Sequence, residues 1–86
     1  MEHSSTLNCL LPGECALVER IETQGGMRRR FLDIGLIENT RVFCVGKSPA
    51  GDPSAYLIRG AVIAIRARDC KGIHIRRVGA EDSVWD

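Results

Sequence analysis

No long hydrophobic run occurs in the sequence. The longest uninterrupted apolar stretch is Ala61-Val62-Ile63-Ala64-Ile65, whereas a helix that spans a bilayer needs about 20 such residues. The first residues, Met1-Glu2-His3-Ser4-Ser5-Thr6, do not show the basic stretch followed by an apolar stretch that is typical of a secretory signal. We therefore expect a cytoplasmic protein with no direct membrane insertion.

The sequence also has no large excess of positive or negative charge. Twelve Lys and Arg residues stand against eleven Asp and Glu residues, which gives a net charge of +1. Domains that bind nucleic acid usually carry a strong positive charge, and a membrane-surface anchor needs a polybasic cluster. The overall balance argues against nucleic acid as a partner and offers no such anchor.

Cysteine and catalytic motifs are also scarce. Four cysteines in 86 residues are too few for a disulfide scaffold, and thiols in a reducing compartment stay free. The sequence has no GxSxG, no HExxH, no P-loop and no glycine-rich dinucleotide fingerprint. We predict that the protein is not an enzyme, has no catalytic residues and needs no cofactor, although spacing alone does not exclude a Cys–His nucleophile pair.

Short alternating segments, separated by turn-forming residues, predict a mainly β fold. We expect five strands, over residues 15–21, 41–47, 55–59, 62–66 and 73–76. A bulge is expected near Glu19-Arg20, because the parity of the apolar positions changes between Val18 and Ile21.

One segment has helical periodicity. Met27, Phe31 and Ile34 fall at i, i+4 and i+7, which places them on one helix face. We predict a short helix over residues 27–36, inserted after the first strand, with Gly35 ending it in a left-handed conformation. Residues 68–72 predict a single turn.

Five short strands with tight connections favour a small closed barrel, because closure removes exposed sheet edges. The alternation predicts these interior residues: Val18, Ile21, Phe31, Val42, Cys44, Leu57, Ile63, Ile65, Ile73 and Ile75. We expect an N-terminal extension over residues 1–9, the barrel domain over 10–78 and a flexible acidic tail over 79–86, in which the role of Trp85 stays open.

The order of these signals resembles one family, the ferrous iron transport protein A (FeoA) family, over about residues 10–78. The resemblance is carried by Arg30-Phe31-Leu32-Asp33-Ile34-Gly35-Leu36, Ser48-Pro49-Ala50-Gly51-Asp52-Pro53, Ile63-Ala64-Ile65-Arg66 and Ile73-His74-Ile75. It implies an SH3-like barrel with one short helix inserted after the first strand. It also implies a small cytoplasmic accessory protein of bacterial ferrous iron uptake that acts with FeoB, a membrane protein with a cytoplasmic GTP-binding domain.

Two positions depart from the family pattern. Glu38-Asn39 stands where the family usually has Pro-Gly, but Asn also tolerates a left-handed turn. Cys70 stands where the family favours a small apolar residue, and a free cysteine behaves as a small hydrophobe. Neither change argues against the expected fold.

Possible metal ligands are few and scattered. No CxxC or HxxxH spacing occurs, so no preformed metal motif is present. Cys44 and Cys70 fall on predicted core positions. The candidate metal ligands are His3, Cys9 and Cys15. The two cysteines flank the first turn, so we expect them to be partly exposed. His74 alternates with two isoleucines and should point outward.

The candidate partner-binding residues are Arg28, Arg29, Arg30, Asp52 and Tyr56. The three arginines, with Arg66, Arg68, Arg76 and Arg77, would form a basic face that docks on an acidic partner surface or on lipid headgroups beside a membrane partner; a merely solvated helix face is the alternative. Asp52 belongs to the 48–53 loop, and Tyr56 lies close by in the next strand. Loops of this kind frame the peptide groove in SH3 barrels, so we expect the loop and Tyr56 to border a protein-binding surface, unless the loop residues serve only backbone shape.

The sequence thus predicts an adaptor that binds the cytoplasmic part of a FeoB-like, GTP-binding iron transporter. A metal-responsive regulatory module and a small transition-metal carrier remain alternatives. A weak homo-oligomer is also left open.

Overall fold

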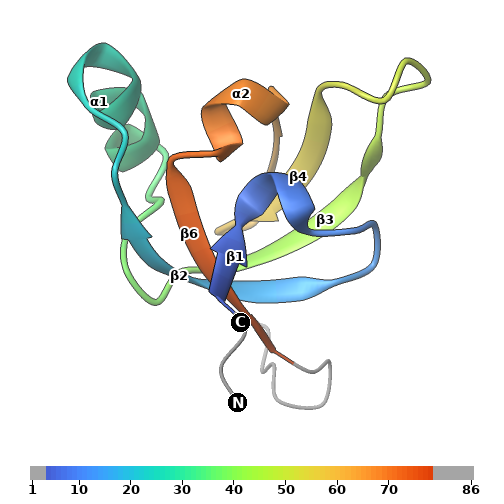
Figure 1. The fold of residues 1–86 in the computed structure, drawn as a ribbon, viewed down its shortest axis with the longest axis horizontal. Coiled ribbons are helices and arrows are strands. Elements are labelled where there is room, and N and C mark those ends of the chain that lie inside the picture. The colour runs from blue at the N-terminus through green and yellow to red at the C-terminus, as the bar shows by residue number, and fades with distance from the viewer. Residues whose placement is uncertain (1–3, 79–86) are drawn as a thin grey trace.

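Six antiparallel strands form one sheet in the order β1-β6-β2-β3-β4-β5 in the computed structural model, which describes residues 4–78 (Figure 1). The expectations for His3, Trp85 and the acidic tail lie outside these residues. The strands are β1 (Ser4–Thr6), β2 (Cys15–Ile21), β3 (Arg41–Lys47), β4 (Ser54–Ile58), β5 (Ala61–Ile65) and β6 (Ile73–Val78). The helices are η1 (Leu7–Cys9), a 3-10 turn, α1 (Gly25–Asp33) and α2 (Ala67–Cys70).

The mainly β class with one inserted helix is confirmed, but the sheet has six strands and is not closed. Within residues 4–78, β1 and β5 are its two ends and do not pair with each other. In Figure 1, α1 and α2 lie at the same end of the curved sheet. No helix in this part of the chain is long and apolar enough to cross a bilayer.

Residues 4–9, part of the expected N-terminal extension, contribute to the sheet and the core. Ser5 pairs with Ile75, so β1 extends the sheet beside β6. Leu7 and Leu10 are fully buried. A three-residue polar strand shows no alternation of its own, and only its distant partner strand makes it a strand.

The predicted left-handed conformation of Gly35 after α1 is confirmed, whereas both bounds of the helix differ from the prediction. The helix starts two residues earlier and ends three residues earlier than predicted, and Gly35 follows it at φ 86°. The Leu36 amide donates to the Phe31 carbonyl and the Gly35 amide to the Leu32 carbonyl, which is the Schellman pattern. Leu36 and Phe31 are both buried, so this helix end is anchored in the core.

Asn39 has φ 68°, as expected for the residue that replaces a glycine of the family pattern. The register of β2 against β6 shifts between Val18 and Arg20, which confirms the predicted bulge.

The core prediction holds for most residues and is wrong for β4. Val18, Phe31, Val42, Cys44, Ile65, Ile73 and Ile75 are buried, and Ile21 and Ile63 pack against them. In β4 the parity is reversed, because Tyr56 and Ile58 point inward and Leu57 is only half-buried. Both faces of this strand carry apolar side chains, so the sequence pattern did not distinguish them.

Candidate partner-binding surface

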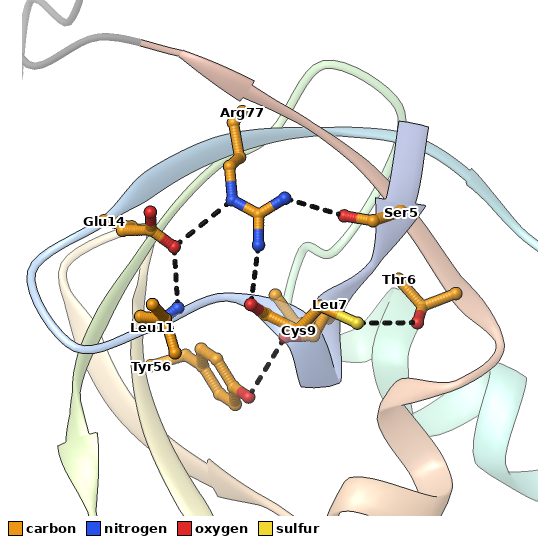
Figure 2. Close-up of polar contacts among 8 residues, drawn as sticks. All are labelled: Ser5, Thr6, Leu7, Cys9, Leu11, Glu14, Tyr56 and Arg77. Atoms are coloured by element: carbon orange, nitrogen blue, oxygen red, sulfur yellow. Dashed lines mark hydrogen bonds and ion pairs between the residues drawn. The ribbon is translucent and has the colours of Figure 1, made fainter. Parts of the chain in front are cut away.

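Arg77 of β6 forms hydrogen bonds with the segment over residues 5–14 (Figure 2). Its guanidinium donates to Glu14 Oε1 at 3.2 Å, to Ser5 Oγ at 3.1 Å and to the Cys9 carbonyl at 2.6 Å. Glu14 Oε1 also accepts the Leu11 amide at 2.8 Å. This backbone hydrogen bond, together with Arg77, holds the pKa of Glu14 below its usual value. The contacts of Arg77 are therefore used within the molecule.

Tyr56 lies beneath this segment and not on the surface. Its side chain is 1% exposed, and its hydroxyl donates to the Leu7 carbonyl at 3.4 Å. The sequence placed Tyr56 beside a binding groove; the structure corrects that placement, since so deeply buried a ring has no surface to offer a partner. Burial raises the pKa of Tyr56 far above its usual value.

The thiol of Cys70 lies 3.6 Å from the Tyr56 hydroxyl. Burial is the main cause that raises the pKa of Cys70 to about 11 and also raises the pKa of Cys44. A protonated buried thiol is neither a nucleophile nor a good metal ligand. Both cysteines are fully buried, as the sequence predicted.

The candidate metal ligands do not form a site in the described part of the chain. Cys9 is exposed, whereas Cys15 is buried, contrary to the expected partial exposure. Residues 4–78 contain no group of three or more His, Cys, Asp or Glu side chains that could hold a metal ion. His3 lies outside these residues, so the proposed trio is not tested.

His74 is half-buried rather than fully exposed. Its Nε2 lies 2.7 Å from Glu22 Oε1, and Arg20 Nε donates to Glu22 Oε2 at 3.2 Å. The hydrogen bond with His74, followed by that from Arg20, lowers the pKa of Glu22. This trio ties the end of β2 to β6.

Asp52 has a structural contact. Its Oδ1 accepts the Ala67 amide at 2.8 Å, so the carboxylate holds the 48–53 loop against the start of α2. A role of the exposed Asp52 in partner binding stays a prediction.

The arginines of the predicted basic face differ in their contacts. Arg28 donates to the Ile21 carbonyl at 3.1 Å, and Arg76 lies 3.7 Å from Glu19. Arg29, Arg30, Arg66 and Arg68 are exposed and make no ion pair with any residue in 4–78. Some arginines thus contact other parts of the chain and support the fold, whereas others are available to bind a partner.

Three of the available arginines meet at one groove. A groove of about 320 Å³ lies between α1, β5 and α2. Its lining is Met27, Arg30, Phe31, Ile34, Ile63, Ala64, Ile65, Arg66, Arg68 and Asp69. Apolar side chains and backbone form much of its wall, and three positive charges against one negative charge lie on it. In the sequence, Arg66 and Arg68 were predicted only as parts of a wider basic face. The missed signal is that Arg66 directly follows the longest apolar run and that Arg68 comes two residues later.

One family model matches most of the chain. The sequence model of the FeoA domain matches residues 5–77. A curated relative, the Fe(2+) transport protein A/Fe(2+) transporter FeoB fusion protein of Porphyromonas gingivalis, is 27% identical over 74 residues, which are 86% of this chain and 9% of that protein. The chain therefore spans a small part of the length of this relative.

Solved structures show the same fold. The FeoA-like protein of Clostridium acetobutylicum superposes with a TM-score of 0.82 at 26% identity, over all of both chains. The FeoA of Stenotrophomonas maltophilia, described as an SH3 domain protein complexed with zinc, gives 0.73 at 24% identity over 81% of this chain and 87% of that one. A manganese-dependent transcriptional repressor gives 0.79 at 18% identity over 91% of this chain and 43% of that one. The predicted SH3-like class is confirmed.

Proposed function

Because the chain belongs to the FeoA family, a domain family linked to ferrous iron transport, we propose that it is a cytoplasmic accessory protein that binds the cytoplasmic part of a FeoB-like transporter. Support comes from the relative in which FeoA and FeoB parts share one polypeptide. Such a link holds two modules at high effective concentration. Without such a link, the two modules would need an interface to stay together.

The observation that carries the proposal is the groove with its three available arginines, Arg30, Arg66 and Arg68. Arginine is enriched at interfaces because its planar fork makes bidentate contacts with carboxylates. Residues 4–78 bring together no metal-binding cluster, so recognition is better supported than metal handling. The protein would change iron uptake only by binding two states of the transporter with different affinities, without catalysis of its own.

The test is capture of the purified, full-length transporter in detergent by the immobilised chain. We expect co-elution, and we expect the double variant Arg66→Ser/Arg68→Ser to lose at least about tenfold in affinity. Arg29→Ser is the matched control, because Arg29 is exposed on the same helix as Arg30 but does not line the groove. Failure of the unaltered chain to bind would refute the proposed function.

Anaerobic titration with ferrous iron separates the adaptor from the alternative functions. An adaptor shows no tight iron binding. Tight one-to-one binding would favour a small metal carrier, and iron binding that changes the oligomeric state would favour a regulatory module.

A further inference from the structure

The outer strand β5 leaves one edge of the sheet without a partner strand within residues 4–78. β5 pairs only with β4, in the register Ile58↔Ala61, Tyr56↔Ile63 and Ser54↔Ile65, with Leu57↔Val62 and Ala55↔Ala64 between. Its other side meets no strand within residues 4–78. An unpaired edge is a ready template for another extended chain.

The turn before β5 decides which backbone groups lie on that edge. Arg59 and Gly60 have φ 50° and 84°, as in a two-residue hairpin turn, whose closing pair is hydrogen-bonded. Hydrogen-bonded and non-bonded pairs then alternate along an antiparallel ladder. Ile63 therefore bonds to β4, whereas the N–H and C=O groups of Val62 and Ala64 point away from it.

These outward groups have no partner in the described chain. No hydrogen bond joins the backbone of Val62 or Ala64 to a segment outside the β4–β5 ladder within residues 4–78. Val62 is 63% exposed, and Ala64 is also exposed. The strand carries no charge, no proline and no bulge, which are the usual means of protecting an edge.

The same strand lines the groove. Ile63, Ala64 and Ile65 lie along one side of it, and Met27, Phe31 and Ile34 come from the α1 side. A chain that adds to the edge of β5 would therefore enter this groove and find apolar contacts there. In strand addition, main-chain hydrogen bonds supply affinity and the neighbouring side chains supply specificity.

The charges at the groove indicate what kind of chain fits. Arg66 follows β5 directly, Arg68 lies on α2, and Arg30 lies on α1; all three line the groove. None of the three forms an ion pair in the part of the chain that is described. Asp69 is the one acidic lining residue, so the groove has an excess of positive charge and complements carboxylates.

We propose that the edge of β5 takes up an extended acidic segment of a partner protein as an added strand, whose carboxylates pair with Arg30, Arg66 and Arg68. The segment bonds to the backbone of Val62 and Ala64. This inference rests on the proposed function in one respect only: the transporter is the protein expected to supply the segment.

The test uses a short, end-blocked peptide of alternating threonine and glutamate, titrated into the full chain and followed by amide NMR. We expect a Kd of about 1 mM or tighter and slower hydrogen exchange at the Val62 and Ala64 amides. Two control peptides, one with glutamine for glutamate and one N-methylated at alternate amides, should bind at least about tenfold more weakly.

Val62→Pro is the sharpest variant, because it removes an outward N–H that the β4 ladder does not use, and proline is tolerated at edges in that orientation. It should abolish peptide binding, whereas Val62→Thr should retain it. If Val62→Pro does not fold, Arg66→Ser/Arg68→Ser provides the test, with weaker binding and a smaller dependence on salt expected.

Several results would overturn the proposal: no binding of the glutamate peptide at about 1 mM, equal binding of all three peptides, or protection outside β5. Concentration-dependent dimerisation through β5 would assign the edge to a second copy and would also refute it. If the peptide binds and the transporter does not, only the proposed partner fails. If the transporter binds and the peptide does not, only the strand-addition site fails.

Discussion

The two ends of the sheet, β1 and β5, are treated in opposite ways. At the β1 end, a three-residue strand is followed by the buried Leu7 and fastened by Arg77. At the β5 end, a five-residue apolar strand has backbone groups that pair with no strand, and it lies beside arginines that form no ion pair within residues 4–78. The difference indicates that one edge contributes to stability and the other is available for binding.

The arginines show the same division. Arg77 contacts three groups of the chain, so its removal should affect folding. Arg66 is exposed and has no ion pair with the described residues, so its removal should affect only recognition. The distinction between the two arginines would fail if removal of Arg66 lowered the stability of the fold, or if removal of Arg77 changed only recognition.

The largest effect is expected from Leu7→Ala. Leu7 is fully buried against the core, and truncation of a buried leucine costs about 2–5 kcal/mol through lost burial and the cavity left behind. Urea denaturation should show this loss in the free energy of unfolding. Val62→Ala is the matched control at the opposite edge and should change it by less than about 0.5 kcal/mol; equal losses would remove the distinction between the two edges.

A smaller effect is expected from Arg77→Met, which keeps much of the aliphatic stem and removes the guanidinium. The loss should be about 1–2 kcal/mol, because three hydrogen bonds to a charged group disappear at a partly exposed site. Arg66→Met should leave the unfolding midpoint in urea unchanged. If Arg66→Met destabilised the protein as much as Arg77→Met, the assignment of Arg66 to recognition would be wrong.

The smallest effect is expected in the pH dependence of the free energy of unfolding, through Glu14. The pKa of Glu14 is lower in the folded state than its ordinary value of 4.5, so its contribution to stability is present above about pH 4.5 and is lost as the pH falls through the folded pKa. Solvent screening limits this contribution to less than about 1 kcal/mol. The free energy of unfolding of Glu14→Gln should therefore fall less steeply with acid than that of the unaltered chain; parallel curves would contradict this role.

Elements whose signals are local could be predicted from the sequence. The bounds of β2 and β3 agree with the predicted ranges, since alternation and turn residues define both ends. Gly35 and Asn39 take the left-handed conformations expected of them because that preference belongs to the residue itself.

Elements that depend on distant partners could not be predicted. β1 is a strand only because β6, some 70 residues away along the chain, pairs with it. The burial of Tyr56 depends on Leu7, which supplies the carbonyl that its hydroxyl needs. The sequence offered no reason to place a polar ring inside when Leu57 was available.

The candidate site shows the same limit. The run Arg28-Arg29-Arg30 is visible in the sequence, but only the fold shows that Arg28 donates to the Ile21 carbonyl and that Arg30 lines the same groove as Arg66. The edge of β5 is also a property of the whole sheet, because strand order decides which strand is outermost. Segment-by-segment patterns do not contain that order.

The most direct test of the account is hydrogen exchange of the chain alone and in complex with the full-length transporter in detergent. We expect exchange to slow at least about tenfold at the Val62 and Ala64 amides and to stay unchanged at the amides of β1. Protection at β1 with no change at β5 in a formed complex would contradict it.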